Sequence, residues 1–128
     1  MRVARLSHLA IKVSSLDRSE AFYGGVLGLS VIKRWQDEGG APRSVWLAMD
    51  GEAFLAVELA HAPSPKRVDE APGFHCLALA IAANERESWR AKVLSAGLSV
   101  ERETPFSLYT RDPDGFLVAL SHYPVAAE

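Results

Sequence analysis

The feature that most constrains the fold of this chain is an internal repeat. A strand-like segment, a helix and three further strand-like segments follow one another twice, which gives the order βαβββ in each half. The predicted segments of the first half are a strand over 6–13, a helix with a capping-box pattern at Asp17 and Glu20 that ends at Gly28, and strands over 29–36, 44–49 and 53–59. Those of the second half are a strand over 75–81, a helix with the same pattern at Asn84 and Glu87 that ends at Gly97, and strands over 98–103, 107–111 and 116–122.

The two halves superimpose over most of their length. At an offset of 67 residues, His8 falls on His75 and Phe22 falls on Trp89. The strand over 53–59, which carries Glu58, falls on the last strand of the chain, which carries Ala119 in the corresponding place. The sequence therefore predicts an α+β fold made of two tandem βαβββ modules.

The boundaries of the modules follow from composition. Module one covers about 5–60, a linker rich in proline and polar residues covers 61–73, and module two covers about 74–123. A chain of 128 residues has the size of one ordinary domain, so we predict a single domain over 1–128.

Composition excludes several classes of function. The formal net charge of −2 gives no general attraction to nucleic acid or to anionic membranes. No apolar run approaches the roughly 20 residues of a membrane-spanning helix, and the residues after Met1 lack the pattern of a signal peptide. The one cysteine, Cys76, rules out an internal disulfide framework. We expect a cytoplasmic protein that has no nucleic-acid or membrane partner.

Three sequence motifs resemble the vicinal oxygen chelate superfamily, the group of glyoxalases, bleomycin-resistance proteins and ring-cleaving dioxygenases. They are the early strand His-Leu-Ala-Ile over 8–11, the Phe-Tyr-x-x-Val-Leu-Gly-Leu signature over 22–29 and the late Asp-Pro-Asp-Gly turn over 112–115. The resemblance implies a U-shaped mixed sheet around a cleft, with the helices outside. Many members are dimers, so the resemblance also implies a homodimer.

The resemblance further implies a metal site. In metal-binding members the ligands come from the first and last strands of each module, and the matching positions are His8, Glu58, His75 and Ala119. Two imidazoles and a carboxylate suit one divalent ion of Zn, Ni, Mn or Fe(II).

Strand alternation supports part of this set. Repeat-related histidines would point into the same cleft, and Glu58 would face a concave interior, where a carboxylate needs a cation or a hydrogen-bonding partner. Glu58 is thus a candidate metal ligand and catalytic residue. The alternative is a structural ion pair with an arginine such as Arg34 or Arg111.

Ala119 limits the reaction. Glyoxalase-like isomerases use carboxylates on both sides of the metal, and dioxygenase-like members use the late-strand acid as the third ligand, so a close copy of either mechanism is not expected. His122, three residues further on, points to the other face of its strand and does not replace the acid. The polar and aromatic residues that could bind substrate are Arg34, Trp46, Tyr109 and Arg111. For Trp46 the alternative is ordinary packing.

Three functions remain in competition. The first is a divalent-metal-dependent enzyme of lyase, isomerase or dioxygenase type that acts on a small oxygen-rich substrate. The second is a metal-free protein of the bleomycin-resistance kind that binds and sequesters a drug or metabolite. Retention of three of the four ligand positions favours the enzyme. A third possibility is a remnant fold used only for association or regulation.

Overall fold

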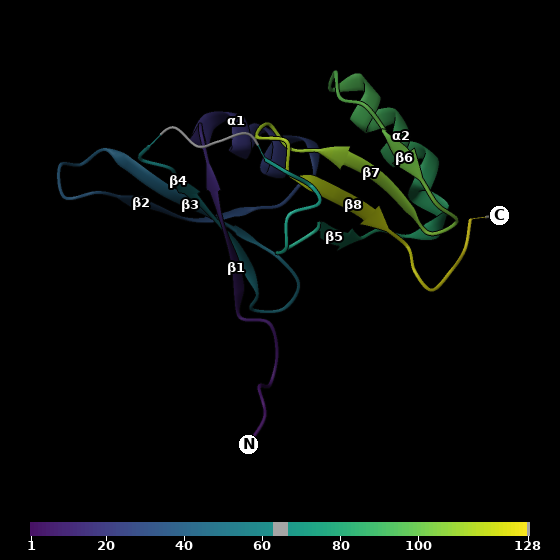
Figure 1. Cartoon of the computed structure of the whole chain (residues 1–128), viewed down its shortest axis with the longest axis horizontal. Coiled ribbons are helices and arrows are strands. Elements are labelled where there is room, and N and C mark those ends of the chain that lie inside the picture. Colours follow the sequence, from purple (N-terminus) through teal and green to yellow (C-terminus); the bar gives the residue numbers. More distant parts are fainter. Residues whose placement is uncertain (63–66, 128) are drawn as a thin grey trace. The chain divides into compact units, whose positions relative to one another are not determined.

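The structure is a computed structural model that describes residues 1–62 and 67–127, so residues 63–66 of the predicted linker lie outside it. The chain divides into two compact units, Met1–Pro65 and Lys66–Glu128 (Figure 1). Each unit contains one four-stranded mixed sheet and one helical segment in the order βαβββ. The predicted α+β class and the two tandem modules are confirmed. That 1–128 forms one domain stays a prediction.

The first unit is built on a sheet that we call sheet A, with the strand order β1-β4-β3-β2. The outer strand β1 runs parallel to β4, and the other neighbours are antiparallel. The elements of this unit are β1 (His8–Val13), α1 (Leu16–Glu20), the π-helix η1 (Ala21–Val26), β2 (Val31–Gln36), β3 (Pro42–Ala48) and β4 (Phe54–Leu59).

The helical segment of the first unit differs from the predicted one in two ways. The N-cap lies within the stretch 14–17 that the sequence offers for it, at Ser15, whose hydroxyl accepts a bond of 3.2 Å from the backbone N–H of Arg18, so the predicted capping box of Asp17 and Glu20 is wrong. The second half is also wider than an α-helix, since the N–H of Leu27 donates to the carbonyl of Phe22, five residues back.

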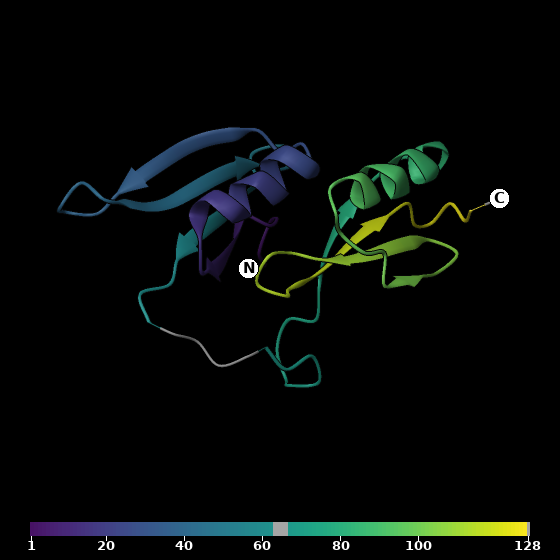
Figure 2. The same ribbon diagram turned by 90° about the horizontal axis from the view of Figure 1, so that it is seen from above.

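Sheet A has one face that is covered by the helical segment and one that is not. One face is covered by the helical segment (Figure 2) and carries the buried core side chains. They are Val13, Val45, Leu47, Leu55 and Val57, together with Phe22 and Tyr23 from η1. Alternation along the strands places His8, Ala10 and Lys12 on the opposite side, which we call the helix-free face.

The second unit repeats this plan around sheet B, with the order β5-β8-β7-β6 and β5 parallel to β8. Its helix covers one face of the sheet (Figure 2). The elements are β5 (Leu77–Ala80), the 3₁₀-helix η2 (Ala83–Glu85), α2 (Arg86–Ser95), β6 (Arg102–Glu103), β7 (Ser107–Arg111) and β8 (Leu117–Ser121).

Three predicted boundaries in the second unit are wrong. The strand predicted over 75–81 begins at Leu77, which leaves His75 outside it, and the strand predicted over 98–103 is reduced to Arg102–Glu103. The capping box of Asn84 and Glu87 does not form, because the 3₁₀ turn takes up Asn84 and the N-cap residue of α2 is Glu85, with no side-chain capping bond.

The helix ends were predicted correctly. Gly28 and Gly97 have positive φ angles of 80° and 78°, a conformation that residues with a Cβ rarely adopt. In the described ranges 1–62 and 67–127, no helix has the length and apolar character needed to cross a membrane.

Candidate functional site

His8 opens β1 on the helix-free face of sheet A, and its imidazole is exposed. The Ser7 hydroxyl lies 3.1 Å from its Nδ1, within hydrogen-bonding distance. The ring stacks on the ring of Phe54, its partner on β4, with the ring centroids 4.8 Å apart and the planes 9° apart. Since Nδ1 is engaged, Nε2 is the nitrogen that His8 can offer to a ligand.

Glu58 lies on the same face, but not beside His8. The parallel register pairs Lys12 with Glu58, and the Lys12 Nζ lies 3.5 Å from the Glu58 Oε2. His8 is four residues before Lys12, about 13 Å along the strand. Only extended side chains leaning toward each other could bring both donors to one ion. The alternative in which an arginine such as Arg34 or Arg111 pairs with Glu58 is wrong, because its cationic partner is Lys12.

The remaining ligand positions belong to the second unit. His75 is exposed and precedes β5 by one residue. Ala119 is buried, and its cross-strand neighbours are Ala78 on β5 and Tyr109 on β7. Neither neighbour supplies a carboxylate in place of the missing acid. Among the described residues, no three His, Cys, Asp or Glu side chains gather into a metal-binding cluster.

Arg34, a predicted substrate-binding residue, is held by an acid of its own unit. Its guanidinium forms a two-pronged pair with Glu20, in which Nη2 donates to Oε2 at 3.1 Å. The hydrogen bonds from Arg34 lower the pKa of Glu20. The pair connects the end of α1 to β2, and a substrate anion would compete with Glu20 for the guanidinium.

Arg111, a second predicted substrate-binding residue, has all its nitrogens occupied. Nη1 and Nη2 donate to the Asp69 carboxylate at 2.8 and 2.9 Å, and Nε and Nη2 donate to Glu101 at 3.0 and 2.7 Å. The carbonyl of Gly115 accepts a further bond of 3.2 Å. These bonds from Arg111 lower the pKa values of Asp69 and Glu101. Arg111 thus ties the segment before β5 to β7.

The two predicted aromatic residues lie in different surroundings. Trp46 is half-buried on sheet A, stacked on Phe54 at 4.3 Å between ring centroids and tilted against Trp35 at 5.2 Å. Tyr109 is half-buried on sheet B beside Ala119, with the Arg102 guanidinium 5.3 Å from its ring centroid. Both keep part of their surface available for a ligand.

Sequence reasoning missed the neighbours that modify the candidate ligands: Ser7, Lys12 and Phe54. Alternation alone put Lys12 on the face of His8, so a signal for its position existed. No local signal indicated that Lys12 would lie opposite Glu58 or that Phe54 would lie opposite His8, because these pairs depend on the register between strands more than 40 residues apart along the chain.

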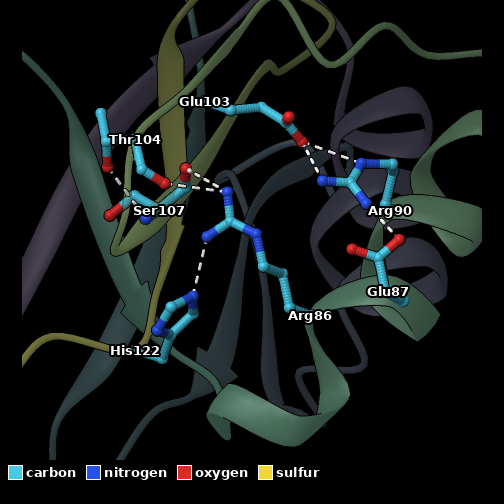
Figure 3. Close-up of polar contacts among 7 residues, drawn as sticks. All are labelled: Arg86, Glu87, Arg90, Glu103, Thr104, Ser107 and His122. Carbon is cyan, nitrogen blue, oxygen red and sulfur yellow. Dashed lines mark hydrogen bonds and ion pairs between the residues drawn. The ribbon is translucent and has the colours of Figure 1, made fainter. Parts of the chain in front are cut away.

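A second polar cluster lies away from the predicted site residues (Figure 3). Arg86 and His122 are both buried, and Arg86 Nη1 donates to His122 Nε2 at 2.8 Å. Arg86 Nη2 donates to the carbonyls of Thr104 and Ser107 at 2.9 and 3.4 Å. Because Nε2 accepts, the ring proton of His122 is on Nδ1, which donates to the Val125 carbonyl. Both ring nitrogens of His122 are therefore engaged within this cluster, and His122 does not replace the acid that is missing at Ala119.

A cavity of about 530 Å³ adjoins this cluster. It is lined by Ala83, Asn84, Arg86, Glu87, Arg90, Val125, Ala126 and Ala127. None of the predicted site residues contributes to it. The candidate site is consequently defined by His8 and its neighbours on the strands, and not by the cavity.

Comparison with known proteins identifies the family. Residues 5–120 match the model of the Glyoxalase/Bleomycin resistance protein/Dioxygenase superfamily, and the chain belongs to that superfamily. A relative from Synechocystis sp. named "Probable lactoylglutathione lyase" is 28% identical, with 90% of this chain and 92% of the relative covered.

Solved structures agree with the fold. The structure of SMU.1112c has a TM-score of 0.80 at 23% identity and covers 94% of this chain and 100% of its own. The fosfomycin resistance protein FosX from Listeria monocytogenes, complexed with Mn(II) and a sulfate ion, has a TM-score of 0.74 at 17% identity, with 94% and 93% covered. At such identities the likeness concerns the fold alone.

The donor types of His8, His75 and Glu58 suit a divalent metal ion, although the described part of the chain does not gather them into a cluster. Two imidazoles and a carboxylate suit borderline divalent ions, and ligating histidines typically have their second ring nitrogen held by another group. His8 meets this condition through Ser7. Glu58 would have to exchange Lys12 for the ion.

Proposed function

We propose that this protein is a divalent-metal-dependent enzyme of the glyoxalase superfamily, of lyase, isomerase or dioxygenase type, acting on a small oxygen-rich substrate. His8, His75 and Glu58 would hold one ion of Zn, Ni, Mn or Fe(II). The observation that supports this most directly is that Nδ1 of the exposed His8 lies beside the Ser7 hydroxyl, which leaves Nε2 as the nitrogen for a ligand, on the face that also carries Glu58.

The protein residues would have separate tasks. A bound divalent ion would act as a Lewis acid toward adjacent substrate oxygens. The Glu58 carboxylate, once released from Lys12, would accept a proton from the substrate. Trp46 and Tyr109 would contact the organic part of the substrate. Arg34 and Arg111 remain candidate substrate residues only if a substrate anion displaces their carboxylate partners.

Metal analysis of protein purified without a histidine tag tests this proposal. Near-stoichiometric metal should be present in the wild type and lost in His8→Ala and His75→Ala. His61→Ala is a matched control, because His61 is exposed and lies between the modules. A wild-type protein that carries no metal and shows no change in thermal stability with added divalent ions would contradict the proposal.

The second candidate, a metal-free binding protein, is favoured by a specific observation. Trp35, Trp46 and Phe54 form a row of rings on sheet A, and the indole nitrogen of Trp35 is buried without a hydrogen-bond partner in the described part of the chain. Such a surface suits a flat organic ligand. Tight binding of an aromatic drug to metal-stripped protein, with no metal in the purified protein, would support this function over the enzyme.

A cytoplasmic homodimer is also part of the proposal. Both β1 and β2 are outer strands of sheet A in the described chain, so their outer edges can meet a second copy. Light scattering on the purified protein should give twice the mass of the 13.9 kDa chain. A monomer at all accessible concentrations would contradict the homodimer and would have no bearing on the metal site.

A further inference from the structure

The imidazole of His8 is held from two directions at once. Its face lies flat against the Phe54 ring, with 4.8 Å between the centroids and 9° between the planes. Its Nδ1 lies 3.1 Å from the Ser7 hydroxyl. The stack restricts the tilt of the ring, and the hydrogen bond chooses which ring nitrogen stays open.

The Phe54 ring is itself supported by the next strands. Phe54 stacks on Trp46 with 4.3 Å between centroids and 24° between planes, and Trp46 contacts Trp35 at 5.2 Å. The register explains this row: Phe54 is directly opposite Ala48 and diagonal to Trp46, and Trp35 is opposite Ser44 and again diagonal to Trp46. Diagonal neighbours in antiparallel strands are within reach of aromatic side chains. Side chains on β4, β3 and β2 thus back the ring of His8.

We infer that Phe54 and Ser7 are positioning residues that orient His8 Nε2 toward a metal ion. The inference rests on the proposed function, because it takes His8 to be a ligand, and it goes further by assigning residues that touch neither metal nor substrate. Groups that fix the orientation and tautomer of a ligating histidine typically alter metal affinity about 10- to 100-fold when they are removed. If Phe54 only packed against its neighbours, its replacement by another apolar residue would leave the metal affinity unchanged.

Calorimetric titration of the metal-stripped full chain with Ni²⁺ tests the inference. Phe54→Leu keeps an apolar side chain but removes the ring face, and should weaken Ni²⁺ binding about 10-fold or more. Phe54→Tyr keeps the ring face and should retain the wild-type affinity for Ni²⁺. Ser7→Ala, like Phe54→Leu, should weaken Ni²⁺ binding. Phe106→Leu is the matched control, since Phe106 also packs on an aromatic ring, Tyr123, but belongs to the second unit.

A second measurement needs no metal. In the NMR spectrum of the metal-free protein, the ring current of Phe54 should displace the carbon-bound ring protons of His8, and the displacement should vanish in Phe54→Leu but persist in Phe54→Tyr. Its absence from the wild type overturns the positioning inference. If the wild type binds Ni²⁺ and Phe54→Leu binds it equally well, the inference is also overturned while the proposed function stands. If the wild type binds no metal at all, both are overturned.

Discussion

Replacing Arg86 should destabilise the protein far more than replacing Arg90, one helical turn further along α2 (Figure 3). Arg86 is buried and supplies hydrogen bonds to three acceptors, which are His122 Nε2 and the carbonyls of Thr104 and Ser107. Arg90 pairs with Glu87 and Glu103, whose side chains are exposed. The two arginines therefore allow a buried network and a surface network to be compared on one helix.

The magnitudes follow from what each substitution leaves behind. In Arg86→Met, two buried acceptors and the half-buried Thr104 carbonyl lose their donor, and a buried acceptor costs roughly 1–3 kcal/mol when unpaired. Removal of a buried charge returns part of this cost, so we expect a net loss of about 3 kcal/mol in the free energy of unfolding. Surface ion pairs contribute about 0–1 kcal/mol, so Arg90→Met should lose less than about 1 kcal/mol.

Urea unfolding of the full chain at pH 7, followed by circular dichroism, measures both values. A double-mutant cycle with His122→Phe should show a coupling energy above about 1 kcal/mol for Arg86, because the two side chains share one buried hydrogen bond. The reasoning would be refuted if Arg86→Met lost no more stability than Arg90→Met, or if the coupling to His122 were zero.

Three other predictions concern separate parts of the molecule. Thr110→Val should raise the free energy of unfolding by about 1 kcal/mol, because the buried Thr110 hydroxyl has no hydrogen-bond partner among the described residues; an unchanged or lower value in urea unfolding would contradict this. The pKa values of Asp69 and Glu101 are lowered by Arg111 from 3.8 and 4.5, so the stability that these carboxylates provide is present above those ordinary values and is lost as the pH falls from them through the lowered pKa values. Arg111→Met should therefore show a smaller loss of stability between pH 7 and pH 3 than the wild type, and equal losses would count against the role of the ion pairs. Ala119→Glu should tighten divalent-metal binding in calorimetry by restoring the missing acid; an unchanged affinity would mean that Ala119 does not occupy the ligand position.

Strand faces and helix ends could be predicted from the sequence, whereas the capping boxes could not. The period-2 pattern of 8–13 separates the face of His8 and Lys12 from that of Val13, because side chains of a strand must alternate, and the structure has the same two faces. Gly28 and Gly97 correctly ended the helices, because their positive φ angles are a local requirement. The capping boxes failed because their side chains had other options: Glu20 binds Arg34, and Asn84 lies in a 3₁₀ turn.

The sequence by itself determined the two βαβββ modules and the kinds of donor available for a metal. These depend on periodicity and on local residue types, which a single chain carries along its length. Only the tertiary structure decided that Lys12 lies beside Glu58, that Phe54 stacks on His8 and that Arg111 is occupied by Asp69 and Glu101. Cross-strand register and the choice of ion-pair partner arise when distant segments pack together, and no local pattern specifies them.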